Sequence, residues 1–85
     1  MDMGTKIRHL RVDQKLTTEA LAEKADTNKA TISETERGLN NNISLPIIIR
    51  IADVLGVSID WLVDDSQGYP PPDRVVEKKR ERSKR

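Results

Sequence analysis

The stretch LTTEALAEKADTNKATISETERG, residues 16–38, decides the fold of this 85-residue chain. Its apolar residues recur at helical spacing, and no alternating strand pattern appears in it. Thr17 and Asn28 are both good N-cap residues, because their side-chain oxygens can accept hydrogen bonds from backbone N–H groups of a first turn. Gly38 favours a left-handed helix C-terminus. The stretch therefore predicts two short helices joined by a turn of about three residues.

Two helices at this spacing are typical of a helix-turn-helix. Ala22 is small enough to let the helices cross closely, while Leu21, Ala25 and Ile32 can fill the angle between them. The second helix is expected to show a polar outer face at its N-terminal end, from which side chains could reach the edges of bases. This face consists of Asn28, Lys29, Ser33 and Glu34, with the small Ala30 and Thr31 between them.

The flanking sequence up to residue 65 also indicates helices. Residues 5–13 carry apolar positions three and four apart, which predicts a helix. Ser44 is expected to cap a helix that ends at Leu55, and Ser58 to cap a short helix over residues 59–63. The fold class predicted is all-α, with five short helices.

Several segments resemble the lambda-repressor-like family of helix-turn-helix domains, the phage Cro and repressor type. They are IRHLR (7–11), residues 16–25, TIS (31–33) running into ERG (36–38), and IADVLGVSIDWL (51–62). The resemblance covers residues 5–65 in order and with the family's spacing. It implies a five-helix DNA-binding domain that acts on double-stranded DNA as a transcriptional regulator, most often a repressor and usually a homodimer.

The resemblance also implies which residues contact DNA: base-reading positions on the third helix, and backbone-contacting positions at the start of the second helix and in the loop after the third. These residues are Thr18, Asn28, Lys29, Ala30, Ser33, Glu34, Arg37, Asn40, Asn41 and Asn42. Arg11 and Glu36 match a buried ion pair that ties the first helix to the third. Glu34 is unusual, because a carboxylate repels phosphate, although in the major groove it can accept a hydrogen bond from cytosine N4.

Three residues depart from the family pattern. Lys15 and Asp26 replace glycines that are common after the first helix and in the turn, and aspartate tolerates a left-handed backbone better than most residues. Thr35 replaces an apolar residue, so its hydroxyl needs a hydrogen-bond partner inside the domain.

Charge divides the chain into a body and a tail. Residues 1–65 hold eight basic and eleven acidic residues, a net charge of −3, whereas residues 66–85 hold seven basic and three acidic residues, a net charge of +4. We interpret residues 66–73, with three consecutive prolines, as a semi-rigid linker. Residues 74–85 are expected to be a disordered or short helical tail, with a phosphate-binding arm as the alternative.

Other functions find little support in the sequence. The chain has no cysteine, no glycine-rich phosphate loop and one histidine, His9, so we expect neither an enzyme nor a metal site nor a cofactor. No segment is apolar enough to span a membrane, and a cytoplasmic location is expected. The acidic body leaves open a protein-interaction module, in which an antitoxin-like fold binds a toxin or protein antagonist. Trp61 is expected in the core or at an interface, and part of the 47–55 apolar stripe could face a dimer partner.

Overall fold

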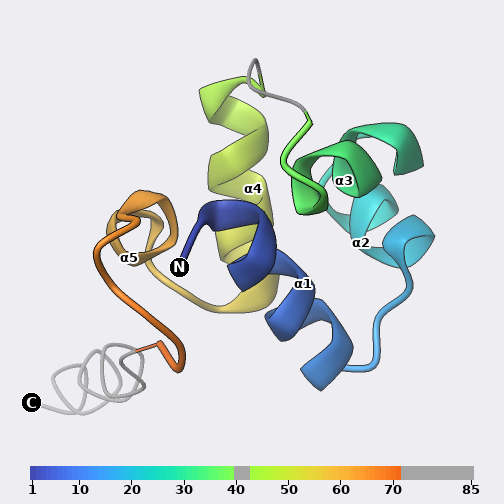
Figure 1. Cartoon of the computed structure of the whole chain (residues 1–85). Coiled ribbons are helices and arrows are strands. Elements are labelled where there is room, and N and C mark those ends of the chain that lie inside the picture. The colour runs from blue at the N-terminus through green and yellow to red at the C-terminus, as the bar shows by residue number, and fades with distance from the viewer. Residues whose placement is uncertain (40–42, 72–85) are drawn as a thin grey trace, which may run out of the picture.

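The computed structural model describes residues 1–39 and 43–71, which form five α-helices and no strand. They are α1 (Met3–Asp13), α2 (Thr18–Lys24), α3 (Lys29–Glu36), α4 (Leu45–Leu55) and α5 (Ile59–Val63). Helix α4 stands in the middle and α1 lies in front of it, with α2 and α3 on one side and α5 on the other (Figure 1). The prediction of an all-α fold is confirmed.

Side-chain caps set the starts of four helices. Thr17, Asn28 and Ser58 each accept a hydrogen bond from the backbone N–H three residues on, at 2.9, 2.8 and 3.1 Å. Asp2 does the same for α1, accepting from Thr5 N–H at 2.9 Å. Because of this cap, α1 begins at Met3, two residues earlier than the predicted Thr5.

The capping hydrogen bond predicted for the Ser44 side chain does not form. Ser44 stands in the N-cap position of α4, but its side chain makes no capping hydrogen bond. Pro46 lies in the first turn of α4 and has no N–H, so one donor that a cap would otherwise satisfy is missing.

Four positions in the described part of the chain adopt a left-handed backbone. Gly38 and Gly56 follow the ends of α3 and α4 with φ of 74° and 77°. Asp26 and Lys15, which stand where the family commonly has glycine, have φ of 58° and 62°. The left-handed turn expected at Asp26 is therefore confirmed, and the same conformation occurs at Lys15.

The core is aliphatic apart from Trp61 and draws on all five helices. Its buried residues are Ile7, Leu10, Leu21, Ala22, Ala25, Ile32, Ile51, Ala52, Leu55, Trp61 and Leu62. Trp61 is 2% exposed, which favours its use in the core over an interface. The apolar residues of α4 fall into two groups: Ile51 and Leu55 are buried, whereas Leu45 and Ile49 are 59% and 49% exposed.

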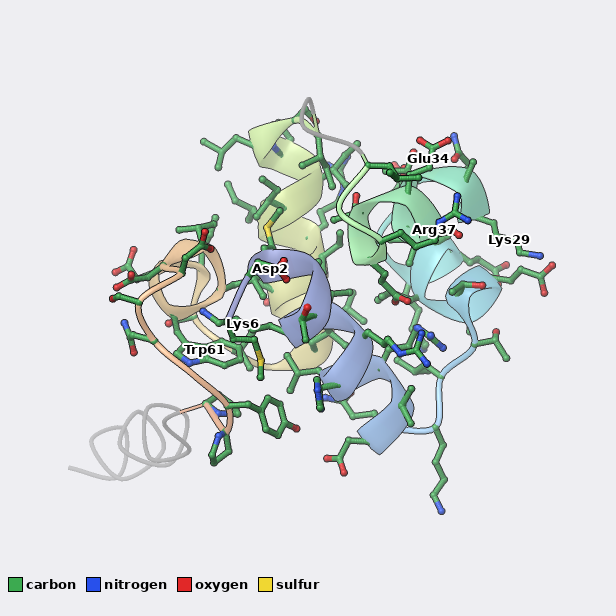
Figure 2. All side chains as sticks on the ribbon, viewed as in Figure 1. Asp2, Lys6, Lys29, Glu34, Arg37 and Trp61 are labelled. Carbon is green, nitrogen blue, oxygen red and sulfur yellow. The ribbon has the colours of Figure 1, made fainter. Side chains whose placement is uncertain are left out.

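Lys6 joins α1 to α5 from inside the fold. Its side chain is fully buried, and Nζ donates to the carbonyl oxygens of Trp61 at 2.5 Å and Asp64 at 2.7 Å (Figure 2). The ammonium also lies 4.6 Å from the centroid of the Trp61 ring, at cation–π distance. These carbonyls belong to the end of α5, where backbone acceptors lack helical partners.

Residues 66–71 pack back on the helices. Trp61 Nε1 donates to the Gly68 carbonyl at 3.1 Å, and the Tyr69 ring lies 5.1 Å from the His9 ring, centroid to centroid. The folded unit thus continues past Asp65, within the segment interpreted as a linker. Residues 72 and 73 and the basic tail, 74–85, lie outside the described residues. No helix in the described part of the chain is long and apolar enough to cross a membrane.

Candidate nucleic-acid interface

Helices α2 and α3 pack through the residues that the sequence assigned to their crossing. Ala22 is 3% exposed, and Leu21, Ala25 and Ile32 are completely buried. Arg50 of α4 donates from Nε to the Ala25 carbonyl at 3.0 Å, which fixes the end of α2 against the rest of the domain. The two helices and their turn are therefore packed together and linked to α4.

An ion pair holds α3 against α1. Arg11 Nε lies 2.6 Å from Glu36 Oε2, and Arg11 Nη2 donates to Oε1 at 3.1 Å, so the pair is bidentate. The side chains are 14% and 5% exposed. Arg11 also donates from Nη1 to the Leu16 carbonyl at 2.9 Å. This guanidinium thus links α1, the loop before α2 and the last residue of α3.

The backbone of α3 also lies unusually close to α1. A Cβ atom added at Gly4 would overlap the carbonyl oxygen of Thr35, so this crossing requires glycine. Thr35 is 4% exposed, and its hydroxyl donates to the Thr31 carbonyl at 2.7 Å. The partner that the buried hydroxyl needs is therefore found within α3 itself.

The opposite face of α3 is open to solvent. At 100° per residue, Lys29, Ala30, Ser33, Glu34 and Arg37 fall within an arc of about 140°. Ser33 is half-buried and the other four are exposed. Lys29, Glu34 and Arg37 lie on the side of the molecule away from Lys6 and Trp61 (Figure 2). The structure thus gathers the candidate base-reading residues on one surface, which we call the α3 face.

The side chains around the α3 face differ in how free they are. Asn28 Oδ1 accepts from the N–H and the hydroxyl of Thr31, at 2.8 and 3.0 Å, so its amide keeps only its NH₂ donors for a ligand. Lys29 Nζ lies 3.7 Å from Glu19 Oε2 across the turn, with both side chains largely exposed. Neither Glu34 nor Arg37 has a side-chain partner within residues 1–39 and 43–71.

The remaining candidates lie at the edge of this surface or outside the described residues. Thr18 is the first residue of α2 and is half-buried, directly after the Thr17 cap. Asn40, Asn41 and Asn42 lie outside the described residues. Within the described ranges, no group of three or more His, Cys, Asp or Glu is placed to hold a metal ion.

The α3 face is suited to hydrogen bonding with the edges of base pairs. It offers cationic donors in Lys29 and Arg37, a hydroxyl in Ser33, and one acceptor-only group, the Glu34 carboxylate. These side chains stand on a helix, and an α-helix fits the major groove of DNA. Helical spacing predicts that Lys29, Ser33 and Glu34 lie together, whereas Arg37 became a candidate through the family resemblance.

Comparisons with known proteins agree with this geometry. A family model described as Helix-turn-helix matches residues 7–62. The HTH-type transcriptional regulator SinR of Bacillus subtilis (strain 168) is 33% identical over 63 residues, which are 74% of this chain and 57% of SinR. The chain therefore matches little more than half the length of that relative.

Solved structures show the same likeness. SinR, the master regulator for biofilm formation, in complex with DNA aligns with a TM-score of 0.68 and 34% identity, over 73% of this chain and 98% of that one. The P22 c2 repressor bound to a synthetic operator aligns with a TM-score of 0.71 and 25% identity, over 75% and 96%. A SinR–SinI complex aligns with a TM-score of 0.73 and 26% identity, over 96% and 80%.

Proposed function

Because the chain belongs to the helix-turn-helix family, in its lambda-repressor-like form, we propose that it is a sequence-specific DNA-binding transcriptional regulator, acting as a repressor. The family is one of transcription regulators and not of enzymes. The observation that carries the proposal is the α3 face, a polar helix surface held rigidly by α2 and by the Arg11–Glu36 pair. We extend the proposal to a cytoplasmic location, where a bacterial or phage operator would be read.

In this proposal α3 enters the major groove of DNA. Lys29, Ser33 and Glu34 meet base edges, and Ala30 leaves room for them to do so. Thr18 and the Asn40–Asn42 loop contact the phosphate backbone and set the register of α3, as do the NH₂ group of Asn28 and the guanidinium of Arg37. DNA complexes of similar chains support this arrangement.

We further propose that the regulator is a homodimer. Two α3 helices about 34 Å apart would reach half-sites one helical turn apart on the same side of the duplex. Leu45 and Ile49 are 59% and 49% exposed and stand four residues apart on α4, so they offer neighbouring apolar side chains for a protein contact.

Selection of bound duplexes from random DNA tests the proposal. The full chain is expected to enrich an inverted repeat with half-site centres about one helical turn apart. Recovery of random sequence at every protein concentration would contradict it. Enrichment of a single, unrepeated half-site would still support sequence-specific binding but would contradict the proposed homodimer.

A second candidate function is a protein-interaction module in which DNA contact is secondary or absent. It is favoured by the net charge of −3 on residues 1–65, which weakens attraction to phosphates, and by the SinR–SinI complex among the similar structures. The partner would be a protein antagonist or toxin. Absence of enriched DNA, together with co-purification of a small protein encoded beside this gene, is the result expected for this candidate.

A further inference from the structure

Glu34 is the one acidic side chain on the α3 face. It is exposed, and no cation in the described part of the chain neutralises it. Lys29 lies within ion-pair distance of Glu19, and Arg37, the C-cap residue of α3, makes no ion pair with Glu34. The α3 face therefore presents a free carboxylate where the proposed function places DNA.

A free carboxylate in this place restricts what it can contact. When ionised it only accepts hydrogen bonds, and it is repelled by phosphates and by the N7 and O6 acceptors of guanine. The major groove offers it two donors, cytosine N4 and adenine N6. Adenine places its N7 acceptor beside N6, which repels the second carboxylate oxygen, whereas cytosine has no acceptor on its major-groove edge. The chemistry thus favours cytosine.

The geometry leaves the carboxylate free to reach a base. Side chains on a helix lean toward its N-terminus, so Glu34 leans over the turn that carries Ala30, four residues earlier. Ala30 is exposed and ends at its Cβ atom, so no longer side chain at that position competes for the same base edge. The backbone under Glu34 is fixed as well, because its carbonyl accepts from Leu39 N–H at 2.8 Å.

We propose that Glu34 is a specificity-determining residue that selects a C·G base pair by accepting a hydrogen bond from cytosine N4, an inference that rests on the proposed function. Its carboxylate contributes little affinity, because it faces a polyanion. It contributes discrimination, because any base other than cytosine leaves it without a donor or sets it against an acceptor.

The experiment compares the sequences selected from random DNA by the wild-type chain, Glu34→Ala, Glu34→Gln and Glu23→Gln. Glu23 is an exposed glutamate on α2 outside the α3 face, so Glu23→Gln removes the same charge from the same type of side chain. Circular dichroism shows whether each variant is folded, which is expected because both residues are exposed. Binding constants are then measured for the selected duplex and for duplexes with each other base at the assigned position.

The wild type and Glu23→Gln should require cytosine at one position of each half-site, with a discrimination of about 5- to 150-fold over the other bases. Glu34→Ala should lose the preference at that position alone, and Glu34→Gln should shift it toward adenine, whose N6 and N7 suit an amide. An unchanged consensus in both Glu34 variants, or a uniform gain in affinity for all duplexes, would overturn the inference and leave the proposed function intact. No enriched sequence with the wild type would overturn both.

Discussion

The Arg11–Glu36 pair provides the sharpest test of how this fold holds its third helix. The perturbations are Arg11→Met, Glu36→Leu and the double variant, which exchange the charged groups for apolar ones of similar length. Arg11→Met leaves the Glu36 carboxylate, 5% exposed, without its cation. Glu36→Leu leaves Arg11 less isolated, because the guanidinium still donates to the Leu16 carbonyl and is 14% exposed.

The expected losses in the free energy of unfolding follow from this difference in burial and remaining partners. Removing one partner of a buried pair costs about 3–5 kcal/mol, and the partial exposure of Arg11 places Arg11→Met near 3 kcal/mol. Glu36→Leu should cost less, about 1–2 kcal/mol. The double variant should be more stable than Arg11→Met, because no uncompensated charge is left inside.

Thermal and urea denaturation measure these differences. For a domain of this size, 1 kcal/mol corresponds to about 4–8 °C in Tm, so Arg11→Met should lower Tm by about 12–24 °C. DNA affinity below the Tm should fall with the loss of the α1–α3 link. Additive effects in the double variant, or a change in Tm of only a few degrees for Arg11→Met, would contradict a stabilising role for the buried pair.

Three further predictions concern stability. Gly4→Ala should lower Tm by an amount equivalent to about 1–3 kcal/mol, despite the better helix propensity of alanine, because its Cβ would overlap the Thr35 carbonyl; an unchanged or higher Tm would contradict the close crossing. Lys6→Met should destabilise the fold by about 1–3 kcal/mol in urea titration, because the Asp64 carbonyl loses the Lys6 donor and the Trp61 carbonyl keeps only a long bond of 3.4 Å from Asp64 N–H; a neutral result would contradict a stabilising role for the buried ammonium. Hydrogen bonds from the side chains of Ser66 and Gln67 and from Ser66 N–H lower the pKa of Asp64 from 3.8 to about 2. The stability that this carboxylate contributes is therefore present above pH 3.8 and is lost as pH falls toward 2, so Asp64→Asn should show a shallower acid-induced decline. Identical pH profiles for Asp64→Asn and the wild type would count against that assignment.

Local signals explain why so much of the fold could be predicted. Caps such as Thr17, Asn28 and Ser58 bond within their own first turn, so their effect does not depend on tertiary neighbours. Helical spacing places Lys29, Ser33 and Glu34 on one face, and the family resemblance added Arg37. The same reasoning placed Leu21, Ala25 and Ile32 in the core.

The features that could not be predicted from the sequence depend on contacts between residues far apart in the chain. Lys6 is buried because its ammonium donates to carbonyls 55 and 58 residues away. In the sequence, the one sign of a buried position is that Lys6 stands four residues before Leu10, on the apolar face of α1. Gly4 has its role because the α3 backbone lies against it. In the candidate interface, the approach of Glu19 to Lys29 could be seen only in three dimensions.

A binding measurement shows directly whether the α3 face reads DNA. A duplex selected by the wild-type chain is titrated with wild type, with the Lys29→Ala, Ser33→Ala double variant, and with Lys24→Ala, which removes an exposed cation of α2 outside that face. We expect the double variant to lose at least about 10-fold in affinity for the selected duplex and much less for random DNA, whereas Lys24→Ala should keep its preference for the selected site. Equal affinity of the folded double variant and the wild type for the selected duplex would contradict it.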